Sequence, residues 1–270
     1  MTFLINKFEQ TKNVFIDDNT PYINLGQSSF AYNKLKSVIE NKIPLSMIYG
    51  KPGTGKTMLL RKIYSELKDK EKINLILTPF QNEKDFLQTF YKILFNTDSN
   101  IEVESIMSKT IELLNSSEID YYIFLLDETQ QYSESILDII RVLSDTKKII
   151  FILSLHKLNS NEKFELAHFK SRVWEKIELQ NIDFSDFKTY FQKKMLQNSL
   201  SEIISIFNDS SLKKIYNYTN GNLREINKFF YKIFDIAIYY ENKNSSMVNT
   251  KNFRAMFLEM SAIDLGYIHV

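Results

Sequence analysis

The chain has 270 residues, of which 44% are hydrophobic and 25% are charged, and its formal net charge is +1. This length allows one large domain or two unequal ones with a buried core, and the charge gives no sign of a basic nucleic-acid-binding domain, although a few placed lysines or arginines could still contact phosphates. The absence of cysteine excludes disulfides and thiolate metal sites, and the three histidines lack metal-ligand spacing, so no zinc site is expected. No apolar run approaches the ~20 residues of a membrane-spanning helix and no secretory signal is recognised, which predicts a cytosolic protein.

The first elements in chain order are an entry segment, a helix and a strand. Residues 1–27 mix aromatic side chains with Asn, Asp and Pro without a clean period, so an irregular segment is expected there. Ser28 and Ser29 are typical helix N-caps, and the apolar positions of residues 30–41 recur at helical spacing. An apolar run of strand length follows at residues 44–49.

Three of the six glycines of the chain fall within the eight residues that follow this strand. The segment matches the phosphate-binding pattern G-x-x-x-x-G-K-[ST], and a helical pattern over residues 58–67 comes directly after it. Strand, glycine-rich loop and helix start form the arrangement that the pattern requires, since the loop and the helix N-terminus direct backbone N–H groups at an anion. The expected phosphate-binding residues are Gly50, Lys51, Pro52, Gly53, Thr54, Gly55, Lys56, Thr57 and Met58.

Two side chains of this loop carry specific expectations. Lys56 supplies a positive charge that reaches the outer phosphates, and the hydroxyl of Thr57 is a ligand for Mg²⁺, so ATP and Mg²⁺ are the expected ligands. The entry segment can either pack against the body of the protein, which is the favoured interpretation, or cover the adenine base with Phe15, Ile16 or Tyr22.

The rest of the chain divides into an alternating part and a helical part. Strand patterns alternate with helical patterns up to about residue 180, and crossovers of this length favour a parallel sheet. The expected strands are at residues 73–77, 121–126, 148–154 and 176–179, and the expected helices are at 83–95, 103–114 and 133–144. Beyond residue 183 only helices are expected, at 184–196, 200–207, 210–218, 223–239 and 250–260. The predicted fold is therefore an α/β domain with five parallel strands at residues 28–180, followed by a small all-helical domain at 181–270.

A continuous apolar strand pattern ends in two acids, Asp127 and Glu128. A run that is apolar throughout is typical of a strand buried on both faces of a sheet. Together with the phosphate loop, the pair suits ATP hydrolysis: Asp127 is the candidate Mg²⁺ ligand beside Thr57, and Glu128 is the candidate that polarises the attacking water. The D-x-x-G element expected of a GTPase is not found after the strand.

Four segments in this order resemble AAA+ ATPases of the ExeA/GspA type, a group that includes the MshM proteins of type IV pilus and type II secretion biogenesis. The resemblance runs from about Ala31 to Ile233 and implies an ATPase that assembles with copies of itself around the nucleotide. The segments that carry it are Gly50 to Thr57, Asp127 to Gln130, Ile139 to Ser144, and Gly221 to Asn227.

The resemblance also suggests roles for single residues outside the phosphate loop. Ser154 resembles the sensor 1 residue, Arg224 resembles the sensor 2 arginine of the lid, and Arg172 resembles an arginine finger that acts in trans with Lys56 and Glu128 in catalysis. The alternatives are a strand-end serine, a surface ion pair and a structural arginine, respectively. Two family patterns are changed, since Ser154-Leu155-His156-Lys157 replaces Gly-Gln-Pro-Glu and Leu223 replaces proline before Arg224. Arg141 also matches the family, without an assigned role.

The function implied by the resemblance is ATP-driven assembly or operation of a type II secretion, type IV pilus or DNA-uptake apparatus. Such a role requires a membrane-associated partner, because this sequence contains no span of its own, and it implies a cytoplasmic protein held peripherally at the inner membrane. The alternative is a DNA-handling ATPase of the transposition-regulator or origin-recognition type, which shares the same core. A switch that binds ATP without hydrolysing it is the third reading.

Overall fold

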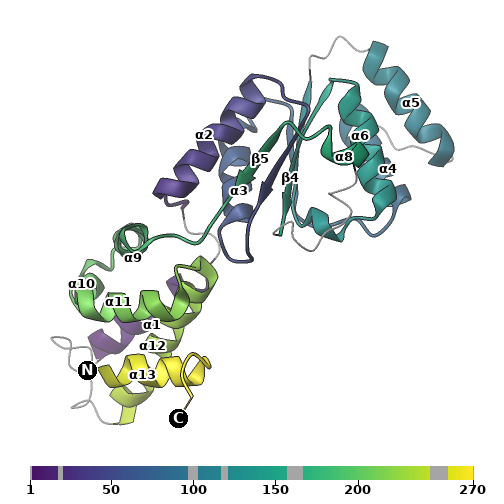
Figure 1. Cartoon of the computed structure of the whole chain (residues 1–270). Helices are drawn as coiled ribbons and strands as arrows, with labels where there is room; N and C mark the ends of the chain where they lie inside the picture. Colours follow the sequence, from purple (N-terminus) through teal and green to yellow (C-terminus); the bar gives the residue numbers. More distant parts are fainter. Residues whose placement is uncertain are drawn as a thin grey trace. The chain divides into compact units, whose positions relative to one another are not determined.

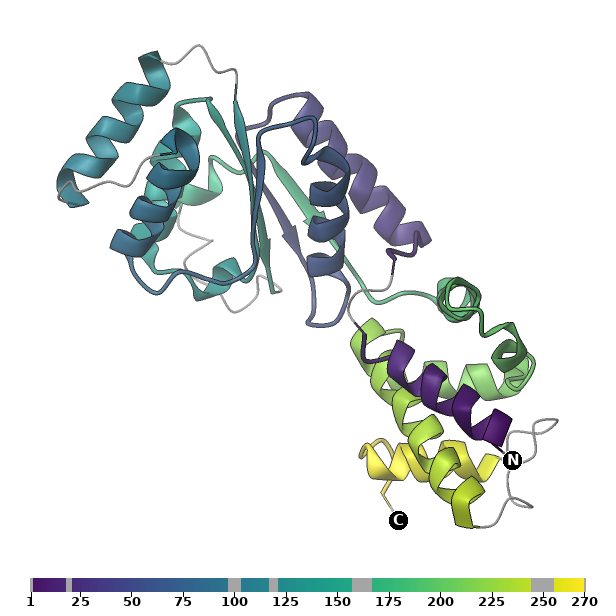
Figure 2. The same ribbon diagram turned by 180° about the vertical axis from the view of Figure 1, so that it is seen from behind.

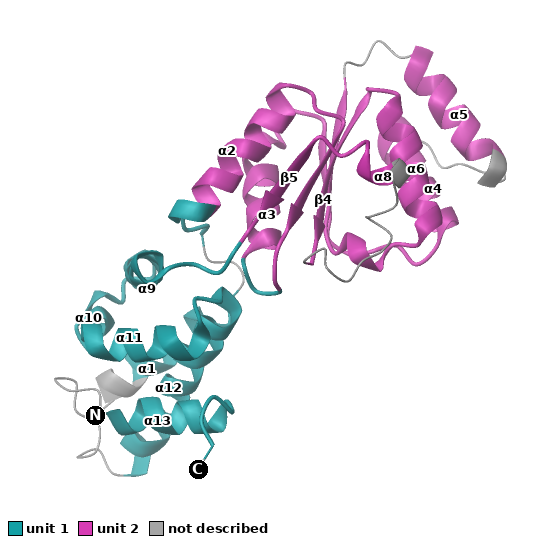
Figure 3. Cartoon of the chain, viewed as in Figure 1, with its two compact units in different colours: residues 1–27, 52–54, 180–270 teal, residues 28–51, 55–179 magenta. Residues whose placement is uncertain are grey.

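The computed structural model describes residues 2–17, 21–96, 103–116, 121–156, 167–243 and 255–269. The chain forms two compact units (Figure 3). Unit 1 comprises Met1–Gln27, Pro52–Thr54 and Gln180–Val270, and unit 2 comprises Ser28–Lys51 and Gly55–Leu179. None of the described helices is long and apolar enough to cross a membrane.

Unit 2 is built on a sheet of five parallel strands in the order β2-β3-β4-β1-β5, which confirms the predicted α/β fold. The strands are β1 (Leu45–Tyr49), β2 (Ile73–Ile76), β3 (Tyr122–Leu126), β4 (Ile149–Leu155) and β5 (Glu175–Glu178). Every residue of β3 and β4 is buried, as expected for central strands covered on both faces. The edge strand β5 is the exception, because only Ile177 of its four residues is buried.

Helices cover both faces of this sheet (Figures 1 and 2). Helices α2 (Gly26–Glu40) and α3 (Lys56–Leu67) lie on one face, while α4 (Glu83–Phe95) and α6 (Glu134–Asp145) lie on the other. The side chain of Phe90 in α4 stacks on Phe124 of β3, with ring centroids 3.9 Å apart, and also contacts Phe151 of β4. These aromatic contacts fix α4 against the centre of the sheet.

Local capping explains where two of these helices begin. The side chain of Asn82 accepts a hydrogen bond from the backbone N–H of Asp85 at the start of α4, and Ser133 does the same for Ile136 at the start of α6. The remaining described helices of unit 2 are α5 (Val103–Ser116), the 3-10 helix η1 (Thr129–Gln131) and α8 (Ala167–Lys170).

The helical part of the chain forms unit 1, and the expectation of an irregular N-terminal segment is wrong for residues 2–14. Helix α1 (Thr2–Val14) packs along α12 (Leu223–Lys243) in this unit. The other helices are α9 (Phe184–Gln197), α10 (Ser201–Ile204), α11 (Asp209–Thr219) and α13 (Ala255–Asp264). The predicted helix at 200–207 is thus shorter, and the predicted start of the last helix at residue 250 lies outside the described residues.

A tight turn joins α11 to α12. Asn220 and Gly221 both adopt positive φ angles, of 48° and 68°. A Cβ atom at position 221 would lie 2.0 Å from the carbonyl oxygen of Ile182, so only glycine fits without moving the backbone. Gly221 therefore permits the tight entry to the helix that carries Arg224.

Phe15 connects the N-terminal segment to the core of unit 1. Its ring stacks on Phe230 of α12 at a centroid distance of 4.8 Å, and only 5% of the residue is exposed. Its neighbour Ile16 is 61% exposed. The packing role of the segment is thereby confirmed for Phe15, which is not free to cover a base.

We expect Phe15→Ala to lower the free energy of unfolding of unit 1 by about 3 to 4 kcal/mol, because it removes a buried ring and leaves a cavity. The matched variant Ile16→Ala should change it by less than about 0.5 kcal/mol. Urea unfolding followed by far-UV circular dichroism measures the change, while fluorescence of Trp174, the single tryptophan, reports on unit 2 alone. Equal effects of the two substitutions would contradict the assignment of this segment to unit 1.

Candidate functional site

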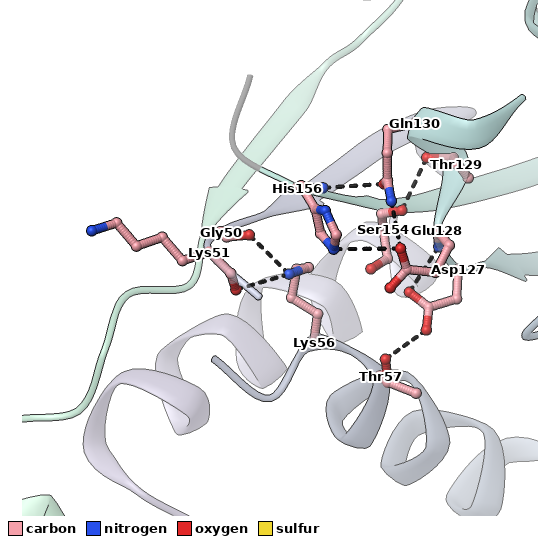
Figure 4. A network of polar contacts seen from close by, with 10 residues as sticks. All are labelled: Gly50, Lys51, Lys56, Thr57, Asp127, Glu128, Thr129, Gln130, Ser154 and His156. Carbon is pink, nitrogen blue, oxygen red and sulfur yellow. Dashed lines mark hydrogen bonds and ion pairs between the residues drawn. The ribbon is translucent and has the colours of Figure 1, made fainter. Parts of the chain in front are cut away.

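The sheet order brings the ends of three central strands together. β1 lies beside β4, and β4 lies beside β3, all three parallel. The phosphate loop follows β1, the acidic pair follows β3, and Ser154 lies near the end of β4. Ligand sites of parallel α/β sheets form at this carboxyl edge, so segments far apart in the sequence meet at one place (Figure 4).

The loop runs directly into helix α3. Gly55 adopts a left-handed conformation with φ of 97° as the N-cap, and the first helical hydrogen bond runs from Leu59 N–H to its carbonyl, at 3.0 Å. The N–H groups of residues 56–58 precede that bond and carry the positive end of the helix dipole. This geometry fits an anion, as the sequence pattern predicts. The loop tip, Pro52–Thr54, is grouped with unit 1.

Lys56 is buried beneath the loop, with 6% of the residue exposed. Its ammonium group donates hydrogen bonds to the carbonyl oxygens of Gly50, at 2.8 Å, and of Lys51, at 3.1 Å. The side chain of Lys51, in contrast, extends away from the group of contacts (Figure 4). Of the two lysines, only Lys56 therefore holds its charge within the loop.

Thr57 and Asp127 lie in direct contact. The Thr57 hydroxyl donates to Oδ2 of Asp127 at 2.6 Å, and Oδ1 of Asp127 accepts from the N–H of Glu128 at 3.0 Å. A hydroxyl and a carboxylate oxygen so close together form a donor set that fits Mg²⁺, which binds one or two protein oxygens and completes its shell with phosphate and water. Burial, with a smaller contribution from the charge of Asp127, raises the pKa of the adjacent phenol of Tyr132, which stays protonated.

Glu128 is the N-cap residue of the short helix η1, and its carboxylate is approached by two side chains that the sequence did not point to. It has a positive φ of 52°, which is uncommon for a residue with a Cβ atom. Its Oε2 accepts a hydrogen bond from Nε2 of Gln130 and lies 3.4 Å from Nε2 of His156. Gln130 belongs to the segment Asp127 to Gln130 that carries the family resemblance, but its contact with the end of β4 could not be read from the sequence.

Ser154 is fully buried, and its hydroxyl has no hydrogen-bond partner among the described residues. An unpaired buried hydroxyl at this edge of the sheet suits a residue that bonds to a ligand, as expected of a sensor. The carbonyl of Ser154 accepts a hydrogen bond from the Thr129 hydroxyl at 3.0 Å, which ties η1 to the end of β4.

Two of the candidate arginines, Arg172 and Arg141, lie outside this group. Arg172 bonds to Asp145 at 3.5 Å and to Ser171 at 3.2 Å, just before β5, and therefore lies at the amino edge of the sheet rather than at the carboxyl edge. Arg141 pairs with Asp138 within α6.

Arg224 lies near the start of α12 in unit 1, and its contact with a γ-phosphate stays a prediction. Tyr22 and Ile16 also belong to unit 1, and their contact with adenine is likewise untested.

Comparison with known proteins agrees with the identification of a phosphate-binding loop and an acidic pair. The family model for the AAA domain (AAA_22) matches residues 43–161, which include the phosphate loop, the acidic pair and Ser154. No curated protein matches the sequence.

Solved structures with the same fold include Cdc6p from Pyrobaculum aerophilum, which has a TM-score of 0.64 and 15% sequence identity over 94% of this chain and 70% of that one. The ORC1 protein of Aeropyrum pernix, solved in complex with DNA, has a TM-score of 0.63 and 12% identity over 94% of this chain and 69% of that one. The ORC2 protein of the same organism, solved in ADPNP and ADP complexes, has a TM-score of 0.56 and 15% identity over 93% of this chain and 71% of that one.

At these identities the likeness concerns the fold, while the family match concerns the segment that holds the site. Residues 43–161 are thus similar to an AAA domain, and the parallel sheet with flanking helices is the fold that this similarity implies.

Proposed function

We propose that this protein is an ATPase that binds ATP with Mg²⁺ and hydrolyses it to ADP and phosphate. The observation that carries the proposal is the direct contact between Thr57 and Asp127, at 2.6 Å, beside the buried Lys56 and the adjoining Glu128. If Asp127 were only a solvated acid at a strand end, a hydrogen bond to Thr57, 70 positions away at the end of the phosphate loop, would not be expected. These groups are the parts that phosphoryl transfer requires.

The proposed step gives each of these residues one task. Glu128 accepts a proton from water as the water oxygen forms a bond to the γ-phosphorus and the bond from that phosphorus to the bridging oxygen of ADP breaks. Lys56 and the N–H groups of the loop and of residues 56–58 hold the phosphates and stabilise their charge. Thr57 and Asp127 would hold Mg²⁺, which neutralises phosphate charge when bound.

Three further residues belong to this proposal on the strength of the family resemblance. Ser154 contacts the γ-phosphate or the water, and its unpaired buried hydroxyl supports that role. Arg224 reports the nucleotide state through the helical unit, and Arg172 completes the site of a second copy, so the ATP-bound protein forms a homo-oligomer. The exposure of Arg172, whose side chain is 43% accessible, supports an action between chains.

For the biological work of the ATPase, the fold comparisons favour DNA handling. The ORC1 protein of Aeropyrum pernix has been solved in complex with DNA, and its likeness extends over 94% of this chain, including the helical unit. The role in a secretion, pilus or DNA-uptake apparatus, with a membrane-associated partner and peripheral attachment at the inner membrane, rests on the ExeA/GspA resemblance alone and is the second candidate.

We expect the purified protein to release inorganic phosphate from ATP in a Mg²⁺-dependent manner, and to bind a labelled DNA duplex with an affinity that falls steeply between about 50 and 200 mM salt, since phosphate contacts release counterions. Phosphate release and fluorescence anisotropy measure the two properties. Lack of phosphate release contradicts the ATPase. If the protein does not bind the DNA duplex, or binds it with an affinity that does not depend on salt, the DNA-handling role is contradicted. The second candidate is then tested by capture of pilus or secretion components with the purified protein.

A further inference from the structure

Gln130 connects the candidate base Glu128 to the end of strand β4. Its carboxamide makes two contacts in opposite directions (Figure 4): Oε1 accepts the backbone N–H of His156 at 3.2 Å, and Nε2 donates to Oε2 of Glu128. The ring of His156 approaches the same carboxylate oxygen, at 3.4 Å. One side chain thus bridges a strand end and a carboxylate that lie on different elements.

The orientation of this carboxamide is set by the backbone. A backbone N–H is always a donor, so the group of Gln130 that faces His156 has to be the oxygen, and the amino group then has to face Glu128. The bond to Glu128 is therefore a consequence of the fold at the end of β4. The Thr129 hydroxyl, which bonds to the carbonyl of Ser154 at 3.0 Å, holds the same short helix to the same strand end.

Both contacts of Glu128 fall on one oxygen. Gln130 and His156 meet Oε2, and Oε1 has no recorded partner among the described residues. The side chain of Glu128 is also 30% exposed, so water can reach it. Because a general base needs one oxygen directed at the water and a fixed orientation of the group, this arrangement fits a base that is held ready and is not blocked.

We infer that Gln130 is a positioning residue of the hydrolysis reaction, which fixes the carboxylate of Glu128 from the end of the strand that carries Ser154. The inference rests on the proposed ATPase function. It gives a physical connection between the candidate sensor and the candidate base, because η1 and the end of β4 cannot move apart without breaking the bonds made by Thr129 and Gln130.

The test replaces the amino group of Gln130, which donates to Glu128, and keeps the oxygen that accepts from the His156 N–H. Gln130→Glu preserves the shape and the oxygen that faces His156, but puts a second carboxylate oxygen against Glu128. We expect kcat for ATP to fall about 10- to 100-fold, because a base displaced by an ångström loses this much. KM and the affinity for a fluorescent ATP analogue should stay within about threefold. Gln131→Glu, in the same short helix but with an exposed side chain, is the matched control and should keep the wild-type kcat.

A second measurement is independent of turnover. In nucleotide-free protein labelled with ¹⁵N at glutamine, the side-chain amide signals lost in Gln130→Glu identify Gln130. They should shift in Glu128→Ala and not in Glu134→Ala, an exposed acid nearby. In a Glu128→Gln background, Gln130→Glu should lower the residual rate no further, since residues that act through one group are not additive.

An unchanged or raised kcat in Gln130→Glu would overturn the inference. The same holds if the Gln130 side-chain amide signals do not shift in Glu128→Ala, or if Gln130→Glu weakens ATP binding as much as it lowers kcat. If the wild-type protein releases no phosphate, the proposed function fails together with the inference. Turnover in the wild type that is insensitive to Gln130→Glu overturns the inference alone.

Discussion

Glu128→Gln is expected to lower kcat for ATP hydrolysis by about 10²- to 10⁴-fold while ATP binding is retained, because the amide cannot accept the proton that a carboxylate takes from water. The substitution preserves the shape of the side chain and leaves the contact between Thr57 and Asp127 in place. Phosphate release under saturating ATP gives kcat, and a fluorescent ATP analogue gives the affinity.

The control for this variant is Glu134→Gln, which changes an exposed acid at the start of α6 and should leave kcat as in the wild type. Wild-type turnover in Glu128→Gln would show that another group activates the water, and the chemical step proposed above would be wrong. Absence of turnover in the wild type, combined with tight ATP binding, would instead favour the switch that binds ATP without hydrolysing it.

Lys56→Ala is expected to weaken ATP binding by about 10- to 150-fold, the equivalent of losing one hydrogen bond to a charged group, about 1.5 to 3 kcal/mol. The rate should fall as well, since the charge also stabilises the phosphates during transfer. The substitution additionally removes the bonds from the ammonium group to Gly50 and Lys51, which hold the loop closed on itself.

Titration with the fluorescent ATP analogue measures this effect, and the thermal midpoint shows whether the domain remains folded. Lys62→Ala is the matched control, because Lys62 lies further along α3 and pairs with Glu66 at 2.6 Å. If the Lys56 and Lys62 variants bind ATP equally well, the segment 50–57 is not the phosphate site despite its sequence pattern.

The sheet and the residues that follow its strands were predictable from local signals. The continuous apolar runs of β3 and β4 require burial on both faces, and a glycine-rich loop between a strand and a helix has few uses other than holding an anion. Parallel strands then bring Thr57 and Asp127 to one edge. For this reason a contact between residues 70 positions apart could be expected before its geometry was known.

Helix α1 was not predictable in the same way. Its buried face has Phe8 and Thr11, and Thr11 is a polar residue whose hydroxyl bonds to the carbonyl of Lys7 at 2.7 Å. A face that includes a threonine gives a weak helical pattern, and the partner helix α12 begins more than 200 residues later. The contacts of Gln130 and His156 could not be predicted from the sequence for a related reason, because polar pairing between a short helix and a strand end leaves no periodic pattern in a sequence.

The place of α1 in unit 1 has a consequence for the order in which the chain folds during synthesis. Helix α1 leaves the ribosome before the other described helices, but α12 is made after the whole of unit 2, so the rings of Phe8 and Phe15 stay without their partners Phe234 and Phe230 until translation reaches the last described helices. Unit 2 can collapse in the meantime, since its strands pair within residues 28–179. The earliest of the described helices is thus among the last to pack, and until then the rings of Phe8 and Phe15 are open to binding by a chaperone.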